Sequence, residues 1–162
     1  MKIVSGKIDV KNVSETLAQI NEIADSCGSS VVIFDAEKTA GKRHIESAVF
    51  HAKRSFEMKT NIARTFAMEV LVYASGQRQC SLASRFGLHT GENAVYAVVI
   101  DGKEDEAAEL LKKVVLVCDA VKADVKRLAK EFDITDEELA VVGEDRIEEL
   151  VIERCAMVDA WK

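Results

Sequence analysis

Hydrophobic and polar residues alternate at the start of the chain and then recur at helical spacing. Residues 2–9 alternate around Gly6, which predicts a β-strand. Asn12, followed by Glu15, resembles a capping box, and Gly28 supplies a left-handed stop. A helix is therefore predicted between them, with an apolar stripe formed by Val13, Leu17, Ile20 and Ala24.

The next two segments predict a buried strand and an amphipathic helix. Residues 30–35 form a short β-branched apolar run. Residues 42–58 carry one apolar stripe, made of Ile45, Ala48, Val49, Ala52 and Phe56. Phe50 falls roughly opposite this stripe, among Arg43, Ser47, Arg54 and Glu57. Phe50 is therefore either packed by another layer or free to dock a partner.

Residues 61–74 are apolar nearly all round, which predicts a helix through the centre of the molecule with only its ends exposed. Ser75 and Gly76 interrupt it. A short helix is predicted from about Gln77 to Gly87, with Cys80, Ala83 and Phe86 directed inward.

The remaining chain predicts a strand at residues 93–101 and helices at 104–116, 120–132 and 145–158. Residues 114–118 fit either a strand or a helix, and Thr135 with Glu138 forms another capping box. Helices thus outnumber strands about two to one, without regular crossover repeats. This pattern favours an α+β fold with a small, mostly antiparallel or mixed sheet and about six helices. Since no linker composition is present, we expect a single domain over residues 1–162.

The composition is that of an ordinary globular protein, with 48% hydrophobic and 31% charged residues. No apolar run approaches the roughly 18 to 20 residues needed to span a bilayer, and residues 1–9 lack an apolar signal core. We therefore expect a cytoplasmic protein, or a nuclear one if the source is eukaryotic, with no membrane partner.

The net charge of −6 conceals a basic segment in the middle of the chain. Residues 38–91 carry nine basic and three acidic groups, whereas residues 1–37 have a net charge of −3 and residues 92–162 of −9. This distribution fits a protein that meets a polyanion on one face only. It also fits cations that merely solvate helix surfaces.

The sequence offers little for catalysis, and we expect no enzyme, metal or cofactor. No phosphate loop, nucleophile elbow or metal-ligand motif is present. His44 and His51 lie on one flank of a predicted helix without a third ligand, and Cys80 with His44 would be a nucleophile pair without local activation. Cys27, Cys80, Cys118 and Cys155 are expected to be buried thiols in a reducing compartment.

Two short segments have the character of a phosphate or nucleotide contact. In residues 75–81, a permissive turn is followed by polar residues at a helix start, where Arg78 adds a planar guanidinium. The turn at Lys59, Thr60 and Asn61, ahead of Arg64, is similar. This turn opens the predicted central helix and so lies at its far end, about 20 Å from Ser75. Only an elongated ligand such as single-stranded nucleic acid would reach both segments.

Three stretches together resemble one protein family. They are Asp35–Lys38 with Ala40–Ile45, Asn61–Arg64 with Glu69–Leu71, and Tyr73–Gln79, and the likeness extends to Glu153–Ala156 in the last predicted helix. In order and spacing they resemble the small kinase-binding subunit of the KEOPS (EKC) complex, the PRPK-binding or CGI-121 family. Cys80 departs from the branched aliphatic residue expected after Arg78 and Gln79.

The resemblance implies a non-catalytic subunit of the complex that makes threonylcarbamoyladenosine in tRNA. Such a subunit binds and regulates the atypical kinase/ATPase subunit and recruits tRNA through its single-stranded 3′ CCA end. By this likeness we expect RNA contacts at Lys59, Asn61, Arg64, Gly76, Arg78, Gln79 and Ser81. The alternative is a purely protein-binding kinase regulator, in which Phe50 docks the partner and the basic segment is incidental.

Overall fold

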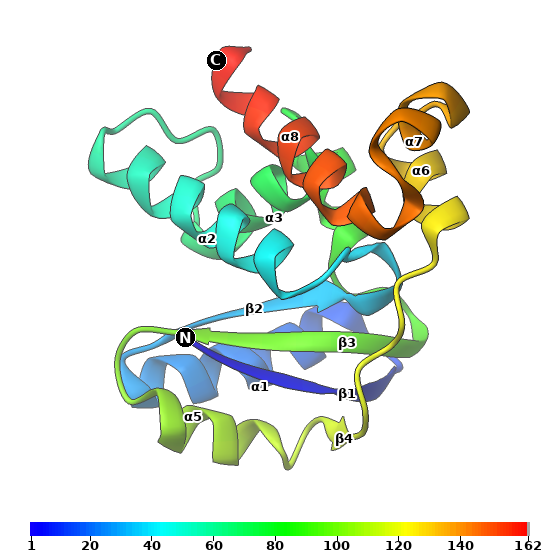
Figure 1. The fold of residues 1–162 in the computed structure, drawn as a ribbon. Coiled ribbons are helices and arrows are strands. Elements are labelled where there is room, and N and C mark those ends of the chain that lie inside the picture. Colours follow the sequence, from blue (N-terminus) through cyan, green and yellow to red (C-terminus); the bar gives the residue numbers. More distant parts are fainter. Residues whose placement is uncertain (162) are drawn as a thin grey trace. The chain divides into compact units, whose positions relative to one another are not determined.

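The computed structural model describes residues 1–161, which form two compact units. The first unit consists of residues 1–36 and 87–121, and the second of residues 37–86 and 122–161. Together they contain eight α-helices and one four-stranded sheet in the part of the chain described (Figure 1). The predicted α+β class is confirmed. That residues 1–162 act as one domain stays a prediction.

The first unit is an antiparallel sheet packed with helices. Its strands have the order β2-β3-β1-β4, and every neighbouring pair is antiparallel. Alternate residues of β1, β2 and β3 form a core with one side of each helix, which includes Val4, Ala97, Ile20 and Leu111. The elements are β1 (Lys2–Val10), α1 (Val13–Cys27), β2 (Ser30–Asp35), β3 (Gly91–Ile100), α5 (Glu104–Leu111) and β4 (Leu116–Val117).

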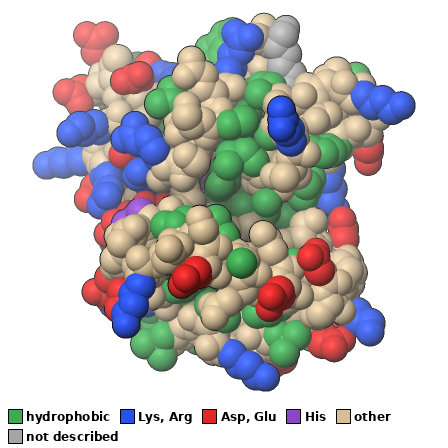
Figure 2. All heavy atoms as spheres, turned by 180° about the vertical axis from the view of Figure 1, so that it is seen from behind, with side chains coloured by type: hydrophobic (Ala, Val, Ile, Leu, Met, Phe, Trp, Pro, Cys, Tyr) green, Lys and Arg blue, Asp and Glu red, His purple; other side chains and the backbone are tan. Residues whose placement is uncertain are grey.

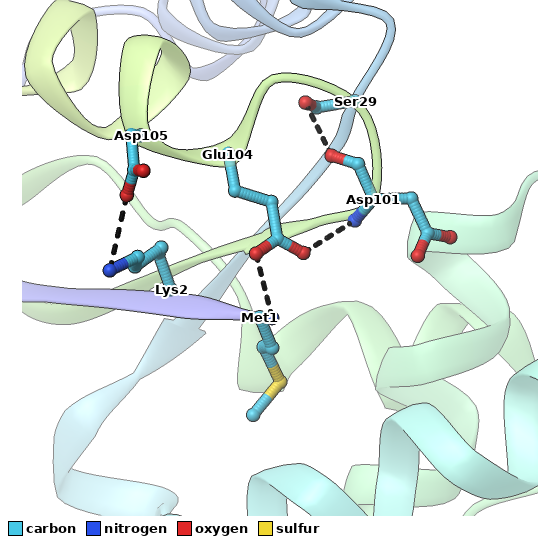
Figure 3. Close-up of polar contacts among 6 residues, drawn as sticks. All are labelled: Met1, Lys2, Ser29, Asp101, Glu104 and Asp105. Carbon is cyan, nitrogen blue, oxygen red and sulfur yellow. Dashed lines mark hydrogen bonds and ion pairs between the residues drawn. The ribbon is translucent and has the colours of Figure 1, made fainter.

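Glu104 joins the first strand to the turn that precedes α5 (Figure 3). Its carboxylate accepts hydrogen bonds from the amino group of Met1 at 2.8 Å and from the backbone N–H of Asp101 at 3.0 Å. The hydrogen bond from the Met1 amino group is the main cause that lowers the pKa of Glu104. Nearby, Lys2 pairs with Asp105 at 3.1 Å. The strand and helix are thus held together by charge as well as by apolar packing.

The second unit is helical. In α2 the predicted apolar stripe is buried except for Phe56, which is half-buried, and in α3 the residues from Glu69 to Ser75 are all buried. The elements are α2 (Lys42–Glu57), α3 (Phe66–Ser75), α4 (Cys80–Ala83), α6 (Val125–Glu131), α7 (Asp136–Val142) and α8 (Ile147–Ala160), with short 3-10 turns at Ala36–Lys38, Ser84–Phe86 and Glu144–Arg146.

Capping predictions were confirmed where the cap is local. The side chains of Asn12 and Thr135 accept hydrogen bonds from the N–H of Glu15 and Glu138 at 3.1 Å each. Gly28 has the left-handed conformation that ends α1. Short-range side-chain chemistry therefore determines these three helix ends.

Four predicted helix boundaries were wrong. The helix predicted over residues 104–116 ends at Leu111, because the backbone turns and Leu116–Val117 pairs with Gly6 and Lys7 of β1. The helix predicted from residue 120 begins at Val125, where the Asp124 side chain caps it. The other two errors, at the starts of α3 and α4, lie at the candidate site.

Candidate nucleic-acid interface

The central helix begins at Phe66, not at Asn61 as predicted. Thr65 is its N-cap, and the Thr65 hydroxyl accepts a hydrogen bond from the N–H of Met68 at 3.3 Å. Residues 58–65 form an irregular segment between α2 and α3, which we call the α2–α3 loop. The expectation that this turn opens the helix, at its far end from Ser75, is therefore also wrong.

A buried carboxylate explains the path of this loop. Glu69, fully buried on α3, accepts hydrogen bonds from the N–H of Ile62 at 3.0 Å and of Ala63 at 2.7 Å. The Ser55 hydroxyl of α2 donates to the same carboxylate at 2.7 Å. The N–H groups of Ile62 and Ala63 would lie in the first turn of a helix that began at Asn61. In the structure they bond the Glu69 carboxylate instead.

The predicted loop residues occupy different positions within it. Lys59 is exposed and has a left-handed backbone, with φ of 57°, directly after the end of α2. The Asn61 side chain donates to the carbonyl of Ala63 at 2.8 Å, and so supports the turn. Arg64 is exposed. Lys59 and Arg64 thus present charge to solvent, while Asn61 shapes the backbone.

Residues 75–81 form the second predicted segment, and its helix start lies later than expected. Gly76, with φ of 67°, caps the C-terminus of α3, and the following helix α4 begins only at Cys80, after Gln79. The amides that precede Cys80 therefore do not form the helix start proposed from the sequence. Arg78, Gln79 and Ser81 are all exposed.

The structure brings the two segments together. Thr60 and Ile62 of the α2–α3 loop line one open hollow with Arg78 and Gln79, and its volume is about 630 Å³. An elongated ligand is thus not needed to touch both segments. Sequence reasoning missed this hollow and Ile62, which lines it, because the path of the loop depends on tertiary hydrogen bonds to Glu69.

Several cations of the basic segment are free of carboxylates. Within the basic segment, residues 38–91, the exposed Lys and Arg side chains without an ion-pair partner are those of Arg54, Lys59, Arg64, Arg78 and Arg85. Lys42 and Arg43, by contrast, pair with Glu46 and Glu149 at 3.8 and 3.9 Å. On the face drawn in Figure 2, several Lys and Arg side chains (blue) gather at the upper left with Asp and Glu side chains (red) among them, and hydrophobic side chains (green) gather into a patch.

A second hollow lies on the other side of Gly76 and has a different character. It has a volume of about 420 Å³ and is lined by Gln77, Glu131, Asp133, Glu153 and Trp161, among others. Arg154 also lines it, but its guanidinium is bound to Glu138 at 2.6 Å. Phosphate groups are disfavoured beside three carboxylates, so a polyanion fits the Arg78 side of this segment better.

The alternative nucleophile pair of Cys80 and His44 is not formed. His44 is buried, and its Nε2 faces the carbonyl of Ala74 at 2.8 Å and Sγ of Cys155 at 3.5 Å. Burial lowers the pKa of His44 to about 4 and raises that of Cys155. Both groups are therefore neutral near pH 7, which suits packing and not nucleophilic attack.

Other predicted features had mixed outcomes. Cys27 and Cys155 are buried as expected, but Cys118 is exposed and Cys80 half-buried, because Cys118 follows a two-residue strand and Cys80 begins a short helix.

No three His, Cys, Asp or Glu side chains within residues 1–161 lie close enough to share a metal ion. No helix in the same range is long and apolar enough to cross a membrane.

Comparisons with known proteins point to one family. The family described as kinase binding protein CGI-121 matches residues 8–159. The regulatory protein Cgi121 of Methanocaldococcus jannaschii is 42% identical over 62 residues, which cover 38% of this chain and 40% of that protein. This chain thus spans about two fifths of the length of the curated relative that it matches. Because the family match extends over nearly the whole sequence, the chain belongs to the CGI-121 family of kinase binding proteins.

Proposed function

We propose that this protein is a non-catalytic regulatory subunit that binds the atypical kinase/ATPase of the KEOPS complex and recruits tRNA through its 3′ CCA end. Membership of a kinase-binding family supports the protein partner. The KEOPS context comes from the likeness described in the sequence analysis. We propose that the RNA contact lies at the hollow lined by Thr60, Ile62, Arg78 and Gln79.

The observation that carries the RNA contact is the position of Arg78. Its guanidinium is exposed beside Gln79 and has no carboxylate partner within residues 1–161, and two segments of the chain converge on it. Unpaired nucleotides offer phosphates and π faces, which a guanidinium binds through hydrogen bonds and stacking. Lys59 and Arg64 add positive charge on the α2–α3 loop. Gly76 and Ser81 lie on either side of Arg78 and Gln79 in the sequence.

A titration with two RNAs tests this proposal. Intact tRNA and tRNA that lacks its CCA end are each titrated against the protein, and the intact RNA is expected to bind more tightly. Arg78→Ala is expected to weaken binding of intact tRNA by about 1 to 3 kcal/mol. Lys130→Ala, which removes an exposed cation on α6, is the matched control. Equal affinity for the two RNAs contradicts CCA recognition.

A purely protein-binding regulator remains the second candidate, and Phe50 favours it. Its side chain is 63% exposed on α2, more than that of any other Phe, Tyr or Trp within residues 1–161. If Phe50 docks the kinase, Phe50→Ser weakens kinase binding in a pull-down titration and leaves tRNA affinity unchanged. Loss of kinase binding in this variant, together with no discrimination between the two RNAs, would favour the second candidate over the first.

A further inference from the structure

The α2–α3 loop is held from inside the unit by Glu69. The carboxylate is fully buried on an otherwise apolar helix, and its bonds to Ile62 and Ala63 involve backbone N–H groups. Burying a charge is unfavourable unless hydrogen-bond donors surround it. A helix that needed only to pack would use an apolar residue here, so the carboxylate requires a different explanation.

Further bonds fix the loop at both ends. The N–H of Thr60 donates to the carbonyl of Ser55 at 2.9 Å, and the Ser55 hydroxyl donates to Glu69. Toward α3, the Asn61 side chain bridges to Ala63, which is itself 3% exposed. Ile62 is therefore held between two fixed points, and Thr60 and Ile62 are the loop residues that line the hollow with Arg78.

We infer that Glu69 is a positioning residue for RNA binding: it sets the wall of the Arg78 hollow by holding the backbone of Ile62 and Ala63. The inference rests on the proposed function, which supplies the ligand. Glu69 does not touch the RNA, because it is fully buried. Its effect is transmitted through two backbone N–H groups.

Glu69→Gln tests the inference, since an amide has one acceptor oxygen where the carboxylate has two. The N–H groups of Ile62 and Ala63 both bond Oε2, so an amide oxygen in that place still accepts from them but carries no charge, and the NH₂ group removes the second acceptor of the Ile62 N–H. Hydrogen bonds to a neutral oxygen are weaker, so the loop is held less firmly. The affinity for intact tRNA is expected to fall about tenfold, which corresponds to about 1.4 kcal/mol. Hydrogen exchange at the amides of Ile62 and Ala63 is expected to accelerate. Affinity for tRNA that lacks CCA should hardly change.

Two further variants separate positioning from general loss of stability. Thr135→Ala removes the N-cap of α7 and lowers stability without touching the loop, so it should leave the affinity for intact tRNA unchanged. Ser55→Ala removes one donor to Glu69 and is expected to weaken binding about threefold. It decides the question if Glu69→Gln does not fold, and wild-type affinity and exchange in Ser55→Ala would then overturn the inference.

The possible failures are distinguishable. If Glu69→Gln folds and binds intact tRNA like the wild type while Arg78→Ala binds weakly, the inference is wrong and the proposed function stands. If the wild-type protein binds both RNAs equally, the proposed function is wrong and the inference falls with it. A loss of affinity in Thr135→Ala as large as that in Glu69→Gln would also overturn the inference.

Discussion

Sγ of Cys155 lies 3.5 Å from Nε2 of His44, and both atoms face the carbonyl oxygen of Ala74. On its other side, Nδ1 of His44 accepts a hydrogen bond from the N–H of Ala40 at 3.0 Å. The acceptor role of Nδ1 places the proton of the neutral ring on Nε2, which donates to Ala74. His44 thereby connects the start of α2 to the end of α3 and the middle of α8, and it does so only while uncharged.

The stability of the protein is expected to depend on pH through His44. Its pKa is about 4 in the folded state against 6.5 in the unfolded chain, because burial disfavours the charged ring. Between these values the unfolded state binds more protons, so the free energy of unfolding falls as the pH drops from 6.5 toward 4. The total effect is on the order of 3 kcal/mol.

Urea unfolding at pH 5 and pH 7 measures this effect. In His44→Asn, the amide oxygen can replace Nδ1 as the acceptor for the N–H of Ala40. This variant is expected to be less stable than the wild type at pH 7, but its free energy of unfolding should fall less between pH 7 and pH 5. Equal losses in the two proteins would show that carboxylates and not His44 cause the acid sensitivity.

The four thiols are expected to differ in alkylation rate. Burial raises the pKa of Cys155 and keeps it protonated, and Cys27 is also buried, whereas Cys118 is exposed. Because thiolate is the reactive form and access is needed, Cys118 should react first and Cys155 only on unfolding. Mass spectrometry after iodoacetamide treatment at neutral pH gives the order. Rapid labelling of Cys155 in the folded protein would contradict its placement.

Tyr73 is expected to contribute more stability through its hydroxyl than Tyr96 does. The Tyr73 hydroxyl donates to Oδ1 of Asp159 at 2.6 Å, whereas that of Tyr96 donates to the neutral carbonyl of Val121 at 3.1 Å. Burial is the main cause that raises both pKa values. Hydrogen bonds to charged groups are stronger, so Tyr73→Phe should cost about 1.5 to 3 kcal/mol and Tyr96→Phe about 1 kcal/mol. Denaturant unfolding of both variants compares them, and the reverse order would contradict the assignment.

Gly28 and Gly102 allow backbone strain to be separated from steric exclusion. Their φ angles, 61° and 62°, are nearly equal. A Cβ at Gly28 would meet nothing within 4 Å, whereas one at Gly102 would collide with the backbone of Gly28 and Cys27. Gly28→Ala is therefore expected to cost about 1 kcal/mol, and Gly102→Ala more than about 3 kcal/mol. Thermal unfolding measures both, and equal losses would show that the turn relaxes around the added methyl group.

The sequence was most informative where structure depends on neighbouring residues. The ends of α1 and the start of α7 follow from single capping side chains, and the stripe of α2 follows from its period. Helical geometry placed Phe50 opposite the stripe but left open whether another layer packs on it, and in the structure its side chain is 63% exposed.

The candidate site was less predictable because its shape depends on contacts between separate elements. Residues 61–65 have a helical pattern, but the carboxylate of Glu69 takes up the amides of Ile62 and Ala63 and so ends that pattern. One signal was available: Glu69 is the single charged residue in the apolar run of residues 66–75. A lone acid in such a run indicates a buried carboxylate that needs donors nearby.

Glu69 holds the loop by main-chain amides, and this makes the course of the loop independent of most of its side chains. Substitutions at Lys59 or Arg64 can alter what the surface presents while the backbone keeps its route. Evolution, or an engineer, can therefore retune the chemistry of this loop by single replacements without redesigning its architecture, as long as the acid beneath it is retained.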